Sequence, residues 1–197
     1  MTTVADILNY IESIAPPYMA ESWDNVGLLC GRRGKEVKKI LVALDPFAHV
    51  CREAKDFGAD LLLTHHVLIF RPGFVTDATP QGQNTLFLIE NGIAHINAHT
   101  NLDLAPGGVN DRLAAQLGLT DITPFGREEY PVGRVGDLPQ AMSAEVFASV
   151  SRFPVRSLVF SYLTRGMAWS DDWSYMKEGI PSFAITDTAY MRCDDYH

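Results

Sequence analysis

The sequence lacks long runs of like charge and long apolar runs. Its 16 lysine and arginine residues and 24 aspartate and glutamate residues give a net charge of -8 and are scattered along the chain. This distribution argues against duplex nucleic acid or an anionic membrane surface as a general partner. Apolar stretches stay shorter than about 18 residues, and the N-terminal segment lacks the basic start and small-residue cleavage site of an export signal. We therefore expect neither membrane insertion nor export.

Cysteine is scarce and follows no pairing pattern. The three cysteines, Cys30, Cys51 and Cys193, are widely spaced and form no C-x-x-C motif. This spacing argues against a disulfide framework and against a zinc site built from thiolates. We expect reduced, structural thiols in a cytoplasmic protein.

Short apolar segments alternate with helical patterns over most of the chain. Strands are predicted at 38–45, 59–66 and 93–100, and helices at 4–14, 46–58, 83–92 and 109–119. The alternation predicts an α/β fold, in which helices flank a mainly parallel sheet. After about residue 125 it weakens to a short strand at 133–138 and a helix from residue 143. In such sheets the functional loops gather at the carboxyl ends of the strands.

Two adjacent histidines, His65 and His66, end one predicted strand, and His99 and Asp103 lie in the loop after the next. Neighbouring side chains in a strand point to opposite faces, so the backbone must turn for both imidazoles to reach one site. That geometry suits two metal ions, with one imidazole for each and Asp103 bridging them. Mixed nitrogen and oxygen donors favour Zn, Fe, Mn or Co over Ca or Mg. His99 is either a further ligand or a residue that orients a ligand or the substrate.

Other polar residues are interpreted as structural. His49 is assigned to a helix and His95 to the interior of a strand. Asp24, in the segment ESWDNVG, is interpreted as part of an Asx-type turn between the first helix and the sheet. Residues 106–108, Pro-Gly-Gly, are predicted to form a plain turn, with an anion-binding helix start as the weaker alternative.

The chain resembles a known family in four segments. In order and spacing, it resembles the Nif-three-like dinuclear metal-centre family, the GTP cyclohydrolase 1 type 2 homologues, in AESWDNVGLLCG, ADLLLTHHVLIF, AHTNLDLAPGGVNDRLAAQLGL and GRVGDL. The resemblance covers about residues 1–150 and implies two α/β lobes in a toroidal homohexamer. It also implies two metal ions, held in the first lobe by His65, His66 and Asp103 with His99 near the site. The implied activity is metal-dependent hydrolase or cyclohydrolase chemistry on a small-molecule substrate.

The C-terminal segment departs from that resemblance. The family completes its metal pair with a His and a Glu a few residues apart in the second lobe, and the sequence has no such motif between 150 and 197. We therefore expect an incomplete second lobe. Residues 151–197 instead resemble the C-terminal part of zinc aminopeptidases of the M-twenty-eight type, with His197 matching their final zinc-binding histidine. This predicts a chimera joined near Ser151, with a metal-binding lobe at 1–150 and a peptidase-like segment at 151–197.

Three functions follow from these patterns. The first is a dinuclear metal-dependent hydrolase, in which the metal ions lower the pKa of a bridging water and a small, nucleotide-like substrate is cleaved. The second is a binding or scaffold protein whose metal ions hold a homo-oligomer together. The third is a zinc aminopeptidase fragment, which the C-terminal segment alone supports. We place the hydrolase first and assign no catalytic side chain beyond the metal ligands.

Overall fold

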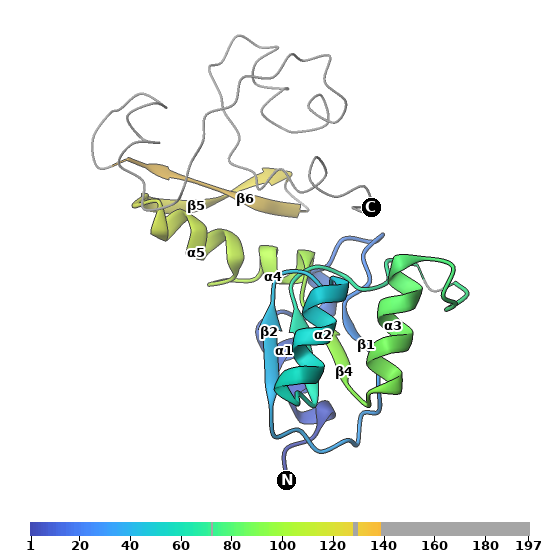
Figure 1. Cartoon of the computed structure of the whole chain (residues 1–197). Coiled ribbons are helices and arrows are strands. Elements are labelled where there is room, and N and C mark those ends of the chain that lie inside the picture. Colours follow the sequence, from blue (N-terminus) through green and yellow to red (C-terminus); the bar gives the residue numbers. More distant parts are fainter. Residues whose placement is uncertain (72, 128–129, 139–197) are drawn as a thin grey trace. The chain divides into compact units, whose positions relative to one another are not determined.

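The computed structural model describes residues 1–71, 73–127 and 130–138 of the chain. The chain divides into two compact units, Met1–Asp137 and Leu138–His197. The helices and strands labelled in Figure 1 all belong to the first unit. The expected domain boundary near residue 150, the helix predicted from residue 143 and the peptidase-like segment lie outside the described residues.

A four-stranded sheet in the order β1-β4-β3-β2 forms the centre of this unit. Its strands are β1 (Gly27–Cys30), β2 (Ile40–Ala43), β3 (Leu61–Thr64) and β4 (Ala94–Asn97). β2, β3 and β4 run parallel, whereas β1 pairs antiparallel with β4. The two inner strands are almost entirely buried, so that even the polar side chains of His95 and Asn97 in β4 lie inside the fold. The predicted mainly parallel sheet is confirmed.

One face of the sheet is covered by α1 (Val4–Ile14). A capping box starts this helix, in which Thr3 accepts a hydrogen bond from the Asp6 amide and Asp6 accepts one from the Thr3 amide. The buried side chains of Val4 and Leu8 then pack against Ile96 and its neighbours in the sheet. Burial of this apolar stripe fixes the helix on the sheet.

The other face is covered by α2 (Ala48–Phe57) and α3 (Pro80–Glu90), which connect successive parallel strands. Cys51 of α2 and Leu88 of α3 pack with Leu62 of β3 in a second core cluster. Gly58 ends α2 in the left-handed conformation, with φ of 71°, as the sequence predicted for a helix stop at this glycine. Helices thus flank the sheet on both faces, as the α/β prediction required (Figure 1).

The chain continues through α4 (Thr100–Leu104) and α5 (Val109–Gln116) into an antiparallel pair, β5 (Thr120–Arg127) and β6 (Tyr130–Asp137). A 3-10 turn, Pro17–Met19, contacts α4. The strands β1 and β5 and the helix α4 were not predicted from the sequence. β1 and α4 are only four and five residues long, and both lie next to Asp, Asn and Gly residues that resemble turn signals. None of the helices in the described part of the chain has the length and apolar composition needed to cross a membrane.

Candidate metal centre

The carboxyl ends of the parallel strands bring three histidines together. His65 and His66 directly follow β3, and His99 lies two residues beyond β4. The ring centroid of His65 lies 5.1 Å from that of His66 and 5.2 Å from that of His99. These three residues are called the histidine cluster below. One possible ligand atom from each of them lies within 4.8 Å of the others. The three imidazoles are therefore close enough to hold a metal ion.

A threonine fixes the turn that both adjacent histidines need to reach one site. The Thr64 hydroxyl donates to the carbonyl of His66 at 2.6 Å, which bends the backbone directly after β3. Because its only proton is used in this way, the same hydroxyl accepts from Nε2 of His95 at 2.9 Å. The turn after β3 is thus fixed by hydrogen bonds of a side chain and does not depend on a glycine.

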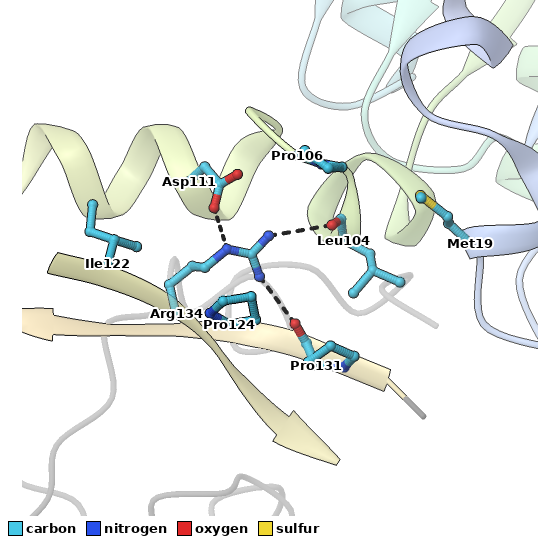
Figure 2. Close-up of a pocket in the computed structure, with 8 residues that line it drawn as sticks. All are labelled: Met19, Leu104, Pro106, Asp111, Ile122, Pro124, Pro131 and Arg134. Carbon is cyan, nitrogen blue, oxygen red and sulfur yellow. Dashed lines mark hydrogen bonds and ion pairs between the residues drawn. The ribbon is translucent and has the colours of Figure 1, made fainter. Parts of the chain in front are cut away.

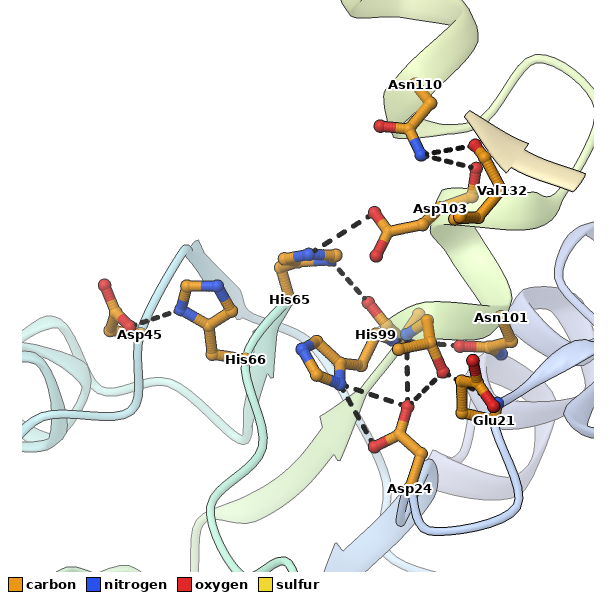
Figure 3. A network of polar contacts seen from close by, with 12 residues as sticks. Glu21, Asp24, Asp45, His65, His66, His99, Asn101, Asp103, Asn110 and Val132 are labelled. Carbon is orange, nitrogen blue, oxygen red and sulfur yellow. Dashed lines mark hydrogen bonds and ion pairs between the residues drawn. The ribbon is translucent and has the colours of Figure 1, made fainter. Parts of the chain in front are cut away.

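Each imidazole of the histidine cluster is held through its Nδ1 atom. Nδ1 of His65 lies 2.9 Å from the carbonyl oxygen of Ala98, and Nδ1 of His66 lies 2.5 Å from Oδ1 of Asp45. Nδ1 of His99 lies 3.0 Å from both carboxylate oxygens of Asp24 (Figure 3). Carbonyl and carboxylate oxygens accept, so each Nδ1 carries the proton and donates it. With Nδ1 protonated, Nε2 is the ring nitrogen that can act as a metal ligand, which is the usual arrangement of metal-binding histidines.

Asp24 is the most highly bonded carboxylate of this network. Besides His99, it accepts from the Thr100 amide at 3.1 Å, from the Thr100 hydroxyl and from the Asn25 amide at 2.8 Å. Burial alone would raise the pKa of Asp24. The hydrogen bonds from His99 and Thr100 and the electrostatic interaction with His99 outweigh burial and lower that pKa to about 2. The carboxylate is therefore ionised at neutral pH. The expected Asx-type turn was an incomplete interpretation, because it overlooked that Asp24 orients His99.

Asp103 reaches the histidine cluster from α4. Its Oδ1 lies 3.6 Å from Nε2 of His65, and both side chains are less than a fifth exposed. Asn110 of α5 supports this helix by donating to the carbonyls of Asp103 at 3.3 Å and Val132 of β6 at 2.9 Å (Figure 3). The carboxylate expected beside the two adjacent histidines thus lies beside them, on a helix rather than in the predicted loop.

The electrostatics of the cluster favour a bound cation. Burial lowers the pKa of His65, although the Asp103 carboxylate opposes this shift. Burial also raises the pKa of Asp103, although the imidazoles of the histidine cluster oppose this shift. A neutral His65 imidazole and a carboxylate whose charged form is disfavoured by burial are groups that a divalent cation would stabilise.

The remaining histidines of the described part of the chain stay away from this cluster. His95 is fully buried in β4, and burial lowers its pKa to about 3, so that it is a neutral core residue. His49 is exposed in the first turn of α2. Both structural interpretations agree with these positions. His197, assigned from the peptidase resemblance, lies outside the described residues.

A separate cavity of about 440 Å³ lies between α4, α5 and the β5-β6 pair (Figure 2). Apolar and proline side chains form most of its wall, together with Asp111 and Arg134. The Arg134 side chain is 7% exposed. Its guanidinium donates hydrogen bonds to the Asp111 carboxylate and to backbone carbonyls, among them that of Leu104. The Gly107 amide donates to Asp111 as well, so residues 106–108 form the predicted plain turn rather than an anion site. Polar groups able to do chemistry are concentrated at the histidine cluster instead.

The fold and the cluster together define an α/β protein with a histidine-rich site, suited to metal binding, at the carboxyl ends of a parallel sheet. The chain belongs to the Duf34/NIF3 family (NGG1p interacting factor 3), whose family model matches residues 2–161. The expected family is confirmed. The match extends beyond Ser151, where a junction was expected, and the chimera stays a prediction.

Related proteins cover most of this chain but are mostly longer. A GTP cyclohydrolase 1 type 2 homolog of Clostridium perfringens is 45% identical over 144 residues, which are 70% of this chain and 55% of that protein. A homolog of the same name from Clostridium acetobutylicum is 30% identical over 212 residues, 98% of this chain and 79% of that protein. The chain thus spans about half the length of the Clostridium perfringens relative.

Solved structures agree with the family assignment. A Bacillus cereus protein related to NIF3 is 37% identical, with a TM-score of 0.60 over 64% of this chain and 35% of that one. Reduced HcgD from Methanocaldococcus jannaschii is also 37% identical, with a TM-score of 0.61 over 68% of this chain and 54% of that one.

Proposed function

We propose that this chain binds two divalent metal ions at the histidine cluster and is a metal-dependent hydrolase of a small substrate. The observation that carries the proposal is the clustering of three imidazoles, each held through Nδ1, whose possible ligand atoms lie within 4.8 Å of one another. Among relatives, the name GTP cyclohydrolase 1 type 2 homolog supports a nucleotide-like substrate. Nitrogen and carboxylate donors favour Zn, Fe, Mn or Co as the metal.

In this proposal His65 and His66 would each hold one ion, and Asp103 would be a ligand of both. His99 would be a further ligand or would orient the substrate. His197 stays the zinc ligand that the resemblance of the C-terminal segment implies. Two bound ions would lower the pKa of a water between them and so supply a hydroxide at neutral pH. The protein's own part is to hold the imidazoles in one tautomer through Ala98, Asp45 and Asp24. A cytoplasmic location, in keeping with reduced thiols, belongs to the same proposal.

Metal analysis of protein purified without chelator tests the site. We expect His65→Ala and Asp103→Ala each to lose at least half of the metal that copurifies with the wild type. His49→Ala is the matched control, because it removes an exposed imidazole of the same chain, and it should retain the full content. Unchanged metal content in both site variants would refute the metal site. Metal-dependent turnover of nucleotides, with guanosine triphosphate included, tests the hydrolase.

A second candidate is a metal-stabilised homo-oligomer, for example a hexamer, that acts as a binding or scaffold protein. The exposed edge of the sheet favours it, because β2 pairs only with β3 in the four-stranded sheet. Val42 in this strand is 70% exposed, and Leu44, directly after the strand, is 51% exposed. Light scattering with and without metal separates the candidates. A hexamer that depends on metal and turns over no nucleotide supports the scaffold, whereas metal-dependent turnover supports the hydrolase.

A further inference from the structure

Two aromatic side chains lie beside the histidine cluster on the side of His99. The Trp23 ring centroid is 6.3 Å from that of His99, with the rings at 76°, and the Phe70 centroid is 5.8 Å from it, with the rings at 71°. The two aromatic rings are 6.0 Å from each other and inclined by 37°. The His99 imidazole therefore meets both aromatic rings in edge-to-face arrangements.

The segment Trp23-Asp24-Asn25 holds these rings in place. Asp24 bonds to His99, and the Asn25 amide side chain donates to the carbonyl of Ile69 at 2.6 Å, directly before Phe70. Asp24 thus ties the segment to the imidazole, and Asn25 ties it to Ile69, the residue directly before Phe70. Trp23 directly precedes these two residues in the chain, and its ring contacts the His99 and Phe70 rings.

Trp23 nevertheless remains 51% exposed, and it belongs to neither core cluster of the described residues. A single exposed apolar residue is ordinary on a protein surface. Trp23 differs because it is anchored by its neighbours and lies next to a cluster of imidazoles. A rigid aromatic face that is not packed in the protein core is well suited to stack on a planar ring.

We propose that Trp23, supported by Phe70, binds the planar heteroaromatic ring of a nucleobase-like ligand whose oxygen atoms reach the histidine cluster. The proposal rests on the proposed function and adds to it the side chains that bind the ring of the nucleotide-like substrate. The aromatic face and the cation site are adjacent, so they fit a ligand with a ring at one end and anionic oxygens at the other. A ligand with the anionic end alone would use only half of the site.

The test compares guanosine monophosphate with ribose 5-phosphate, which lacks the base. Binding of each to the full chain loaded with Mn²⁺ is measured by isothermal titration calorimetry. We expect the wild type to bind the nucleotide about tenfold more tightly than the sugar phosphate, as base stacking on an aromatic side chain allows. Trp23→Leu should bring this ratio close to one, whereas Trp23→Phe should retain most of it. Tyr10→Leu removes an aromatic side chain that is 65% exposed on α1 and should keep the wild-type ratio.

Equal affinity of the wild type for both ligands overturns the proposal, and so does a ratio that Trp23→Leu leaves unchanged. The Mn²⁺ content of the same samples separates this result from a failure of the metal site. A chain that holds Mn²⁺ without preferring the nucleotide refutes the ring site alone, whereas a chain that holds no Mn²⁺ refutes the metal site.

Discussion

The Asp45 carboxylate lies 2.5 Å from Nδ1 of His66 and joins the ends of two neighbouring parallel strands, β2 and β3. Asp45 stands two residues beyond β2 and His66 two residues beyond β3. A carboxylate that accepts from the far nitrogen of an imidazole fixes the ring orientation and makes the near nitrogen a better ligand. Asp45 therefore acts on the proposed metal through His66 rather than by direct contact.

Replacement of Asp45 tests this role. Asp45→Ala should lower metal affinity about tenfold or more, because His66 loses the partner that sets its tautomer. Asp56→Ala is the matched control, since it removes an exposed carboxylate from α2 and should leave affinity unchanged. Competition with a chromogenic chelator gives both affinities. Equal affinities in the two variants would contradict the role of Asp45.

Asp24 should matter for stability even without metal. Asp24→Ala leaves the His99 ring and the Thr100 amide without their acceptor in a buried network, which is expected to cost about 2 kcal/mol of unfolding free energy. Denaturant unfolding of metal-free protein measures the loss. Asp77→Ala, at an exposed position of the same chain, should unfold like the wild type. Matching midpoints for Asp24→Ala and wild type would show that the network adds little to folding.

Asp60 gives the fold a defined acid sensitivity. The backbone amides of Lys38 and Lys39 and the Lys35 ammonium favour its carboxylate and hold the pKa of Asp60 below the ordinary 3.8. Such a group stabilises the folded state above about pH 3.8, and that contribution is lost as pH falls through the folded pKa.

We expect Asp60→Asn to be destabilised by about 1 kcal/mol at pH 7 and to approach the wild type as the pH falls below about 4. Urea unfolding at a series of pH values measures the difference. A difference that stays constant down to pH 2.5 would place the stabilising interaction elsewhere. Glu53→Gln, an exposed change in α2, should show no such pH dependence.

The two described thiols should be unreactive in the folded chain. Burial raises the pKa of Cys30 and of Cys51 to about 11, so about one thiol in a thousand is ionised at pH 8. In a Cys193→Ser background, a disulfide reagent should therefore react slowly with folded protein. The same reagent should titrate two thiols rapidly after addition of guanidinium. Rapid reaction of either thiol before unfolding would contradict its burial.

The strand and helix alternation carried most of the fold prediction, because the strand segments are short and largely apolar and the helices between them end at recognisable residues such as Gly58. The adjacent histidines could be placed in the site because the carboxyl ends of parallel strands meet at one edge. Asp45 could have been found by the same argument, since it follows the segment KKILVAL directly.

Asp24 could not be found in this way. It precedes β1, which runs antiparallel to the others, so the rule about carboxyl ends does not place it near the histidines. Its neighbours Asn25 and Gly27 indicate a turn, and a turn residue that also holds an imidazole has the same local sequence as one that does not. Only the pairing of β1 with β4, which is a non-local contact, reveals its role.

The hydrogen bond between Asp24 and His99 spans 75 residues of chain. Contacts of such large sequence separation require closure of a long loop and form late in folding. The His99 ring thus acquires its fixed orientation only when the first strand docks on the sheet. The rate at which refolding protein takes up metal should accordingly follow the docking of that strand, so metal uptake would report on the formation of a long-range contact during folding.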